Sequence, residues 1–404
     1  MKGLFEGIKV LNLSWVMVGP TVTRYLADQG ATVINVENID HPCILRGSPP
    51  YKDKKPGINR SGYFAQQNPN KLSLGLNIAC PKGREITRRL AKWADVVAES
   101  FSPGVIERIG LSYKELCQVN PSIIYFHTSM LGHSGPLARI RGFGFQLVGY
   151  TGFTYITGWP DRPPDQPYGP YTDVIAPRYI TCVLILALLY RRKTGKGVYI
   201  DVSQNEAGLQ FLIPILLDYQ VNGRVKEREG NSCLYYCPHG TYPCKGEDRW
   251  VAIAITNEEE WRAFQEIIGR NWVWDEKFST FLERKGNEVE LDGLVSSWTA
   301  EHSPEEVMKL LQEKNIPCGV VKNAPDLLQD PQLRHRNAFW ELEHEPVGKH
   351  TVFAQLFILS KSPPVPPKPA DRLGEHTYHI CHEILRMSDE EITSLLSEGV
   401  LQTT

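Results

Sequence analysis

Neither sign of charge is in excess in this sequence. Lysine and arginine together number 44, and aspartate and glutamate number 46, which gives a formal net charge of −2. Nucleic acids and anionic membranes are bound mainly through a surplus of positive charge. The sequence therefore predicts neither a nucleic acid nor a membrane as partner.

Long apolar runs are also scarce. The longest lies at residues 179–190, and it is much shorter than the roughly 20 apolar residues that a helix needs to cross a bilayer. We interpret this run as part of a buried core helix. The start of the chain lacks the apolar stretch of a secretory signal peptide, so we expect a cytoplasmic protein.

The nine cysteines form no pattern of pairs. An odd number scattered over helical and strand-like segments argues against a disulfide framework and again favours a reducing cytoplasm. Cys233, Cys237, His239 and Cys244 lie close together, but zinc sites usually combine two short ligand pairs with a long loop between them. This cluster instead overlaps a strand–turn–strand pattern. Packing of the thiols is therefore favoured over a structural metal, and no metal is predicted.

A chain of 404 residues exceeds the size of one ordinary hydrophobic core, so we expect two domains. Strand-like and helical segments alternate over residues 1–225. Strands are expected at residues 8–13, 32–37, 72–78, 95–99, 122–128 and 198–203, and the main helices at 21–29, 81–93, 113–118, 177–192 and 205–219. This alternation predicts an α/β fold, in which helices cover both faces of a doubly wound parallel sheet and ligands bind at the carboxyl ends of the strands.

The pattern changes near Gly230 to a hairpin followed by amphipathic helices. This change is typical of a small α+β domain, which we place at residues 226–335. Residues 336–404 are expected to return to the large domain through a proline-rich tether at 363–369 and a final helix capped by Ser388. Residues 130–172 are rich in glycine, proline and aromatic residues without a clear period, which predicts a shaped loop region.

The most informative stretch lies where this loop region meets the next helix. Residues 167–173, Pro-Tyr-Gly-Pro-Tyr-Thr-Asp, place a single carboxylate, Asp173, at the start of an apolar helix that we interpret as fully buried. Backbone N–H groups at a helix start favour an ionised carboxylate, which a nucleophilic aspartate requires. Aspartate is also a common helix cap, so both roles are considered.

Two glycine-containing segments do not support nucleotide binding of the familiar kinds. The first strand-to-helix turn, residues 14–20, contains only Gly19 and lacks the G-x-G-x-x-G fingerprint of dinucleotide sites. Glu37 at the end of the second strand is then better explained as a helix or turn partner than as a ribose ligand. Residues 194–197 follow a helix rather than open one, so we interpret them as a cation-rich helix C-terminus with glycine at the cap.

Short motifs run along the whole chain, and their order and spacing are more specific than any one of them. They occupy residues 7–13, 19–20, 26–37, 94–104, 108–110, 132–136, 172–173, 193–197, 330–331 and 373–377, together with Tyr63, Phe64, Asn68, Asn70 and Lys71. In this order the chain resembles the class III CoA-transferases over nearly its whole length. The resemblance implies a doubly wound large domain, an inserted small domain and an interlocked dimer of two ring-like subunits. It also implies that Asp173 is the nucleophile.

The resemblance further implies where CoA binds. The implied contacts are Val16 and Met17, the segment from Leu76 to Ala79, Ser100 and Phe101 in the turn at 99–102, Arg108, and Arg141 and Phe143 in the segment 141–144. Arginine suits phosphate groups, and an aromatic ring suits the adenine. We therefore expect Arg108 and Arg141 to bind CoA phosphates and Phe101 or Phe143 to flank the base. No cofactor is expected, because CoA is itself a substrate.

The chain also departs from the family pattern. Asn38, Leu72, Asn77 and Gly144 stand where family members commonly have Arg, Arg, Asp and Asp, so the CoA contacts are expected to be remodelled or weaker. The same fold includes α-methylacyl-CoA racemases, whose acid–base histidine falls at Phe143 here. Two-base racemisation lacks a base on that side, and a transferase is favoured over a racemase.

The sequence therefore predicts a CoA-transferase that acts through aspartyl anhydride and aspartyl-CoA thioester intermediates. Its expected partners are an acyl-CoA donor, with succinyl-CoA suggested, and an aromatic acid or a substituted succinate as acceptor. The aromatic acceptor follows from the many aromatic residues near the expected site. Predicted substrate contacts are Trp15, Tyr168 and Tyr171, with Arg46, Arg60 and Arg178 as candidate ligands of a second carboxylate.

A second hypothesis treats the chain as a non-catalytic, CoA-binding partner subunit of a hetero-oligomeric CoA-transferase. Asn38 and Gly144 support this hypothesis, and the retained Asp173 argues against it. The expected assembly is accordingly either a homodimer or a hetero-oligomer with a homologous subunit.

Overall fold

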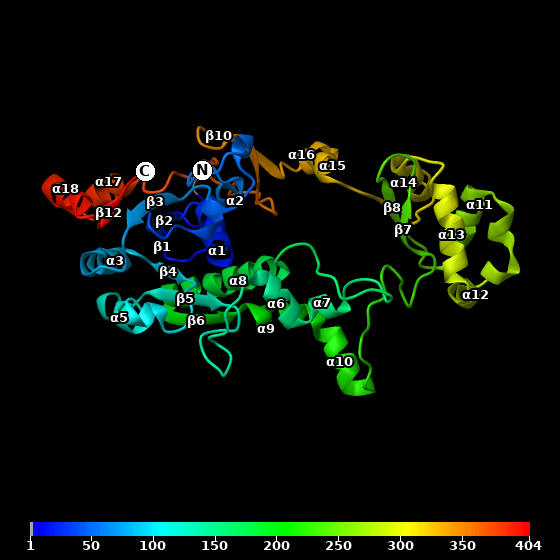
Figure 1. Cartoon of the computed structure of the whole chain (residues 1–404), viewed down its shortest axis with the longest axis horizontal. Coiled ribbons are helices and arrows are strands. Elements are labelled where there is room, and N and C mark those ends of the chain that lie inside the picture. Colours follow the sequence, from blue (N-terminus) through cyan, green and yellow to red (C-terminus); the bar gives the residue numbers. More distant parts are fainter. Residues whose placement is uncertain (1–2) are drawn as a thin grey trace. The chain divides into compact units, whose positions relative to one another are not determined.

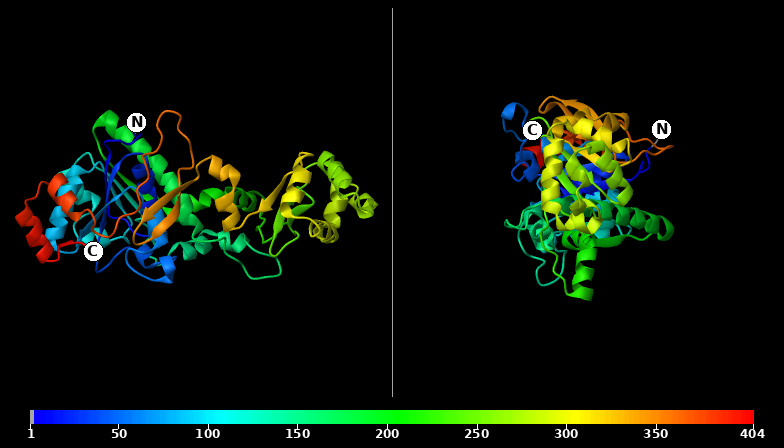
Figure 2. Two further views of the ribbon diagram at one scale, coloured as in Figure 1. Left: turned by 90° about the horizontal axis from the view of Figure 1, so that it is seen from above. Right: turned by 90° about the vertical axis from the view of Figure 1, so that its right-hand side faces the viewer.

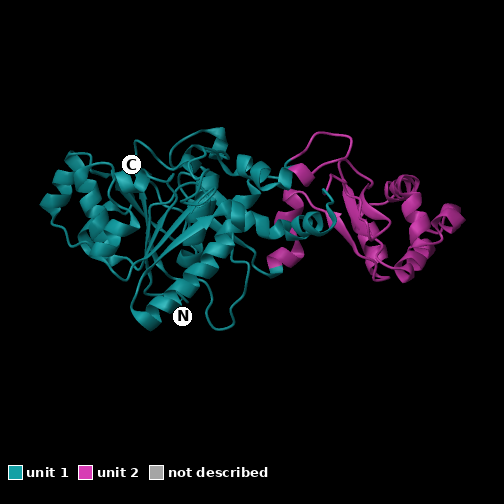
Figure 3. Cartoon of the chain, turned by 90° about the horizontal axis from the view of Figure 1, so that it is seen from below, with its two compact units in different colours: residues 1–154, 166–225, 335–404 teal, residues 155–165, 226–334 magenta. Residues whose placement is uncertain are grey.

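The computed structural model describes residues 3–404, which form two compact units (Figures 1 and 3). The first unit comprises the chain up to Thr154, Gln166–Val225 and His335–Thr404. The second comprises Tyr155–Asp165 and Lys226–Arg334. Segment 155–165 thus belongs to the second unit, whereas the sequence analysis places it in the first domain.

The first unit is built on a seven-stranded sheet with the order β12-β3-β2-β1-β4-β5-β6. The parallel strands are β1 (Lys9–Asn12), β2 (Thr32–Glu37), β3 (Leu72–Leu76), β4 (Val96–Glu99), β5 (Ile124–Ser129) and β6 (Val198–Ser203). The short β12 (Leu401–Gln402) adds an antiparallel edge beside β3. The predicted α/β class with a large parallel sheet is confirmed, and the order 3-2-1-4-5-6 is that of a doubly wound sheet.

Helices cover both faces of this sheet (Figure 2). On one face, α3 (Pro81–Trp93), α5 (Tyr113–Val119) and α18 (Asp389–Ser397) share a core with side chains of the sheet. On the other face, α1 (Val18–Asp28) packs against α8 (Tyr171–Thr194). Because both faces of these strands are buried, apolar residues are needed along their whole length. The strands therefore appear in the sequence as continuous apolar runs.

The segment at 130–172 contains more regular structure than its composition predicts. It includes α6 (Gly144–Thr151) and α7 (Phe153–Ile156). Conversely, the single helix expected at 205–219 is broken into α9 (Gln204–Leu209), a 3-10 turn and α10 (Ile213–Asn222). Pro214 explains the break, because proline fits the first turn of a new helix but removes a hydrogen bond from a helix interior.

Helix α8 is not the fully buried core helix that the sequence predicts. One side packs against α1, β5, β6 and α9, while the other exposes Val183, Leu189 and Leu186, the last at 64%. Helix α10 has no buried residue at all. Among the described residues, α8 is the one helix long and apolar enough to cross a membrane by length and composition, and 44% of its most apolar window is buried. Exposed apolar faces of this size are uncommon on soluble monomers.

The second unit has its own antiparallel sheet of β7 (His239–Pro243), β8 (Trp250–Ala254) and β9 (Cys318–Val321). Its helices are α11 (Glu258–Ile268), α12 (Phe281–Gly286), α13 (Glu288–Thr299), α14 (Pro304–Gln312), α15 (Ala324–Gln329) and α16 (Pro331–His335). Cys237 and Cys244 are buried in this core, and desolvation raises their pKa values to about 12 and about 11. Nowhere in residues 3–404 do three or more His, Cys, Asp or Glu side chains gather as metal ligands.

The C-terminal segment returns to the first unit. It forms the hairpin β10 (Phe339–His344) and β11 (Gly348–Phe353), an irregular tether, α17 (Thr377–His379), a π-helical turn and α18. The proline-rich tether lies along the sheet domain, where Val365 N–H donates to the carbonyl of Asp28. Ser388 Oγ caps α18 by accepting the N–H of Glu391 at 3.2 Å, as the sequence predicts.

Candidate functional site

Two loops leave the first unit's sheet at the point where the strand order reverses, one after β1 and one after β4. Trp15 N–H donates to Ser100 Oγ at 2.9 Å, and the rings of Trp15 and Phe101 meet edge to face with centroids 5.8 Å apart. In open α/β sheets, ligands bind in the crevice beside such a reversal. The structure therefore brings together three of the predicted site residues at the expected place.

The loop after β1 carries backbone strain. Val16 has φ of +62°, a left-handed conformation that a β-branched residue rarely adopts, and its N–H is held by Cys43 Sγ at 3.3 Å. Its neighbour Met17 accepts the Tyr63 hydroxyl on its sulfur at 2.9 Å. Strain of this kind persists only where the surroundings enforce it, and it is concentrated at ligand sites.

Asp173 lies in the first turn of α8 with 7% of its surface exposed. Its carboxylate has no hydrogen-bond donor among the described residues, and desolvation raises its pKa to about 7. Burial thus opposes the stabilisation of the ionised carboxylate that its helix-start position was expected to provide. Asp173 does not cap the helix either, since Pro170 occupies that position.

Gly144, at the start of α6, is in direct contact with this carboxylate. A Cβ atom added at Gly144 would lie 2.7 Å from each carboxylate oxygen of Asp173 and 2.4 Å from Cβ of Pro170. The absence of a side chain at Gly144 thus provides the space that Asp173 occupies. The sequence analysis interpreted the same glycine as a lost CoA contact, which neglects this packing.

Tyr63 is a residue of the site that the sequence analysis did not select. Burial raises the pKa of its hydroxyl, and the charges of Asp173 and Tyr168 raise it further. Tyr63 therefore links Met17 after β1 to the surroundings of Asp173. The sequence signal that could have identified Tyr63 is its place in the first turn of a capped helix. This helix is α2 (Gly62–Gln67), and Ser61 is its N-cap.

Other predicted site residues are dispersed. Tyr168 is fully exposed, and Tyr171 meets Phe153 edge to face at 5.2 Å. Phe143, Ala79, Arg108 and Arg141 are exposed on the first unit. Leu76 differs, because its side chain is buried in the sheet core and cannot line an open site.

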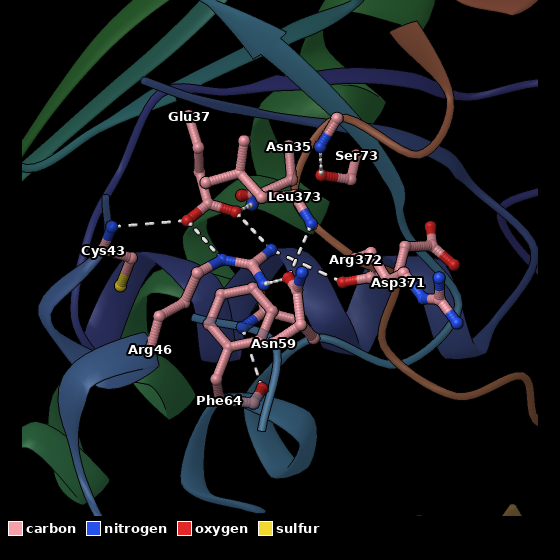
Figure 4. A network of polar contacts seen from close by, with 12 residues as sticks. Asn35, Glu37, Cys43, Arg46, Asn59, Phe64, Ser73, Asp371, Arg372 and Leu373 are labelled. Atoms are coloured by element: carbon pink, nitrogen blue, oxygen red, sulfur yellow. Dashed lines mark hydrogen bonds and ion pairs between the residues drawn. The ribbon is translucent and has the colours of Figure 1, made fainter. Parts of the chain in front are cut away.

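Arg46, predicted to bind a substrate carboxylate, is instead part of a buried network (Figure 4). Its Nη2 and Nε atoms donate to the two carboxylate oxygens of Glu37 at 2.8 and 2.9 Å, and Nη1 donates to Asn59 Oδ1 at 2.9 Å. The ring of Phe64 covers its flat face at 3.6 Å. With every side occupied, the guanidinium has no room for a substrate, which argues against the predicted role.

Of the other two candidate cations, Arg60 is half-buried and Arg178 is exposed, and both have protein partners. Arg60 donates to the carbonyl oxygens of Lys55 and Lys52, each at 3.0 Å, and its guanidinium lies 3.7 Å from Asp53. Arg178 donates to the carbonyl of Val174 on its own helix. Within residues 3–404, neither arginine forms a hydrogen bond or an ion pair with Asp173, Tyr63 or Gly144.

Comparison with known proteins identifies the family to which this chain is similar. Residues 5–377 match the model of a family described as CoA-transferase family III. The chain is 30% identical to human succinyl-CoA:glutarate CoA-transferase over 98% of its own length and 89% of that protein. It is 28% identical to the alpha subunit of a succinyl-CoA–L-malate CoA-transferase of Chloroflexus aurantiacus, with 98% and 92% covered.

Two further matches complete the comparison. A probable CoA-transferase of Mycobacterium tuberculosis is 30% identical over 98% of this chain, and this chain spans only 50% of that protein's length. Among solved structures, a CaiB/BaiF family protein of Brucella suis superimposes with a TM-score of 0.87 at 27% identity. That alignment covers 95% of this chain and all of the other.

The buried carboxylate predicts an unusual pH dependence of stability. The pKa of Asp173 rises from about 3.9 in the unfolded chain to about 7 in the fold, so its stabilising contribution is complete below pH 4 and is lost as the pH rises through 7. Asp173→Asn removes this pH-dependent loss of stability, because the amide does not ionise. We expect the free energy of unfolding of the variant, relative to wild type, to increase by roughly 4 kcal/mol between pH 4 and pH 8, at about 1.4 kcal/mol for each pKa unit.

Urea unfolding at several pH values measures this difference. Asp40→Asn is the matched control, because it makes the same substitution at an exposed position, and Asp173→Asn is compared with it at each pH. Parallel curves for Asp173→Asn and wild type would show that the carboxylate is not desolvated.

Proposed function

Because the chain belongs to CoA-transferase family III and is a CoA-transferase, we propose that it moves CoA from succinyl-CoA to a dicarboxylic acid through covalent intermediates on Asp173. The observation that carries this proposal is the Asp173 carboxylate. It is buried, lacks a hydrogen-bond donor among the described residues, and has a pKa raised to about 7. A desolvated carboxylate is a stronger nucleophile than one solvated by water.

The proposed reaction proceeds in four balanced steps. An Asp173 oxygen attacks the thioester carbonyl of the donor, which gives an aspartyl–acyl anhydride and releases the CoA thiolate. The thiolate attacks the aspartyl carbonyl, which gives an aspartyl-CoA thioester and releases the donor carboxylate. The acceptor carboxylate then attacks this thioester and displaces the thiolate. Attack of the thiolate on the acceptor carbonyl forms the new acyl-CoA and regenerates Asp173.

Burial of Asp173 serves this chemistry in a second way. An anhydride hydrolyses readily, so water must be kept from the carbonyl during both anhydride steps. Gly144 and Pro170 lie against Asp173 on one side, and Tyr63 is close enough to feel its charge. We propose that Trp15, Val16, Met17, Ser100 and Phe101 hold the CoA thioester beside this pocket, since their two loops meet where the strand order reverses.

The acceptor is proposed to be a dicarboxylic acid that carries an apolar or aryl substituent. Relatives of this chain are named for glutarate, D-citramalate and L-malate, all with succinyl-CoA or succinate as counterpart. Phe143 and Phe145 flank Gly144 in sequence, and each exposes about half of its surface or more. Exposed rings on both sides of the position that touches Asp173 favour an apolar substituent on the acceptor.

Asp173→Ala is expected to reduce transfer to the detection limit while CoA binding persists, because the carboxylate is a covalent relay. In wild type, kcat/KM for succinyl-CoA should rise about tenfold per pH unit up to pH 7 and then level, since only the ionised carboxylate attacks. Borohydride or hydroxylamine should modify Asp173 only after succinyl-CoA is added. Turnover of Asp173→Ala at the wild-type rate would contradict the mechanism.

The acceptor proposal is tested by a panel of acids at a fixed succinyl-CoA concentration. Glutarate, L-malate, oxalate and benzylsuccinate differ in length and in apolar surface. We expect kcat/KM to be highest for the substituted succinate and lowest for oxalate, with Phe145→Ala reducing the first severalfold and leaving malate unchanged. A preference for oxalate would overturn the aromatic-pocket argument.

A second candidate function is that of one subunit in a hetero-oligomeric transferase. A relative of this chain is named an alpha subunit. In addition, α8 and α10 have exposed apolar faces that a second subunit could bury. We propose that these faces bind a second copy of the chain, or a homologous subunit, in the interlocked ring-like assembly that the family resemblance implies. Racemase activity is disfavoured, because Phe143 supplies no acid–base group.

Sedimentation analysis and activity of the purified chain test this assembly. We expect a dimer that Leu186→Asp on α8 converts to a monomer, whereas Leu356→Asp, at an equally exposed leucine outside these helices, leaves it unchanged. An inactive chain that gains activity with a homologous subunit would favour the hetero-oligomer. A wild-type monomer with full activity would contradict both assemblies.

A further inference from the structure

A buried histidine, His127 in β5, lies beside the turn that follows β4. Its side chain is fully buried, and its Nδ1 atom lies 2.5 Å from Oε1 of Glu99, which is itself 1% exposed. The other ring nitrogen, Nε2, is buried and has no hydrogen-bond partner among the described residues. Within residues 3–404, the polar contact of the His127 side chain is therefore with Glu99 alone.

The register of the sheet brings these two side chains together. Glu99 and His127 lie opposite each other in the parallel pairing of β4 with β5, so their side chains leave the sheet on the same face. Glu99 is the last residue of β4, and the turn begins at the next residue, Ser100. His127 thus contacts Glu99 at the point where the strand passes into the turn.

Glu99 extends this contact to the turn itself. Its second carboxylate oxygen, Oε2, accepts the backbone N–H of Phe101 at 2.8 Å. A carboxylate only accepts hydrogen bonds, so Nδ1 of His127 carries the proton of the other bond. Each oxygen then has one donor, and a buried oxygen left without a donor is costly. His127 therefore favours the one orientation of the carboxylate that also receives Phe101 N–H.

The histidine ring is itself held from its other side. The ring of His133 meets it edge to face, with centroids 4.7 Å apart. The backbone N–H of His133 donates to both carboxylate oxygens of Asp201 at 3.0 Å, and Asp201 lies opposite His127 in the pairing of β5 with β6. Side chains packed in this way have little freedom to move. The His127 ring can therefore act as a fixed support for Glu99.

We propose that His127 is a positioning residue for the transfer reaction. Through Glu99 it holds the backbone of Phe101, and with it the Phe101 ring against Trp15, in the arrangement that receives the CoA thioester. The inference rests on the proposed function in placing CoA at this turn. His127 does not touch the substrate, because it is fully buried. A buried polar ring is costly unless its hydrogen bond is needed, and this bond supplies the need.

Three variants separate positioning from packing. His127→Leu fills a similar space without a donor, whereas His127→Asn places an amide nitrogen near the position of Nδ1 and so keeps the donor. Ile392→Ala is the control for lost stability, because Ile392 is buried on α18 and α18 packs near β12 at the edge of the sheet, away from β4. If His127→Leu does not fold, His127→Gln replaces it, because its amide nitrogen falls nearer Nε2 than Nδ1.

Amide hydrogen exchange of the unliganded protein measures the order of the turn directly. We expect residues 100–102 to exchange about tenfold faster in His127→Leu than in wild type, because the turn opens more often when Glu99 is free to rotate. His127→Asn should restore most of the protection. Ile392→Ala should increase exchange near α18 and leave residues 100–102 unchanged.

Steady-state kinetics measures the consequence for the reaction, with glutarate as the acceptor. We expect the KM for succinyl-CoA to be about fivefold higher in His127→Leu, with kcat and the KM for glutarate close to wild type. His127→Asn should recover most of the affinity for succinyl-CoA. Ile392→Ala should lower the melting temperature and leave the KM for succinyl-CoA unchanged.

Two outcomes would overturn the proposal. Unchanged exchange of residues 100–102 in His127→Leu would show that Glu99 holds the turn without His127. An equal rise in KM in His127→Leu and His127→Asn, or a rise in Ile392→Ala, would assign the effect to packing or stability. A wild-type chain that does not bind succinyl-CoA would refute the proposed function instead, and faster exchange in His127→Leu would still establish the support of the turn by His127.

Discussion

The sheet grows in two directions from β1. The chain first adds β2 and β3 on one side of β1, and it then crosses over to add β4 on the other side. The loops after β1 and β4 must therefore depart to different faces of the sheet, and a crevice opens between them. The contact of Trp15 with Ser100 and Phe101 joins the two loops at this crevice. The left-handed backbone of Val16 is the local strain that accompanies this path, and the first unit's fold enforces it.

Asp173 illustrates how a fold can bury a carboxylate without a donor at a cost in stability. Desolvation disfavours its ionised form, and the rest of the first unit must offset that penalty at neutral pH. Gly144 is part of the same compromise, because any side chain there would overlap the carboxylate. The two residues are best understood as one packing unit, in which the glycine creates the space and the aspartate occupies it without a hydrogen-bond donor.

Charged side chains in the first unit fall into two classes that the sequence does not separate. Arg46 is enclosed by Glu37, Asn59 and Phe64, and removing such a buried partner usually destabilises a fold strongly. Arg108 and Arg139 are instead exposed, and within the described part of the chain neither has an ion-pair partner. All three look alike as letters in a sequence. Only the positions of carboxylates distant in the chain decide which arginine is structural and which is available for a ligand.

The sequence by itself determined the α/β class, the strands from β1 to β6, the family and the helix-start position of Asp173, because each is recorded in local periodicity or in short motifs. The buried sheet gives continuous apolar runs, and Gly195 marks the end of α8 by its left-handed conformation. Tertiary structure alone decided the raised pKa of Asp173, the role of Gly144, the exposed face of α8 and the burial of Arg46. Each depends on groups far away in sequence. The desolvation of Asp173 is caused by the atoms around it, and the apolar sequence of α8 does not specify which of its sides another element covers.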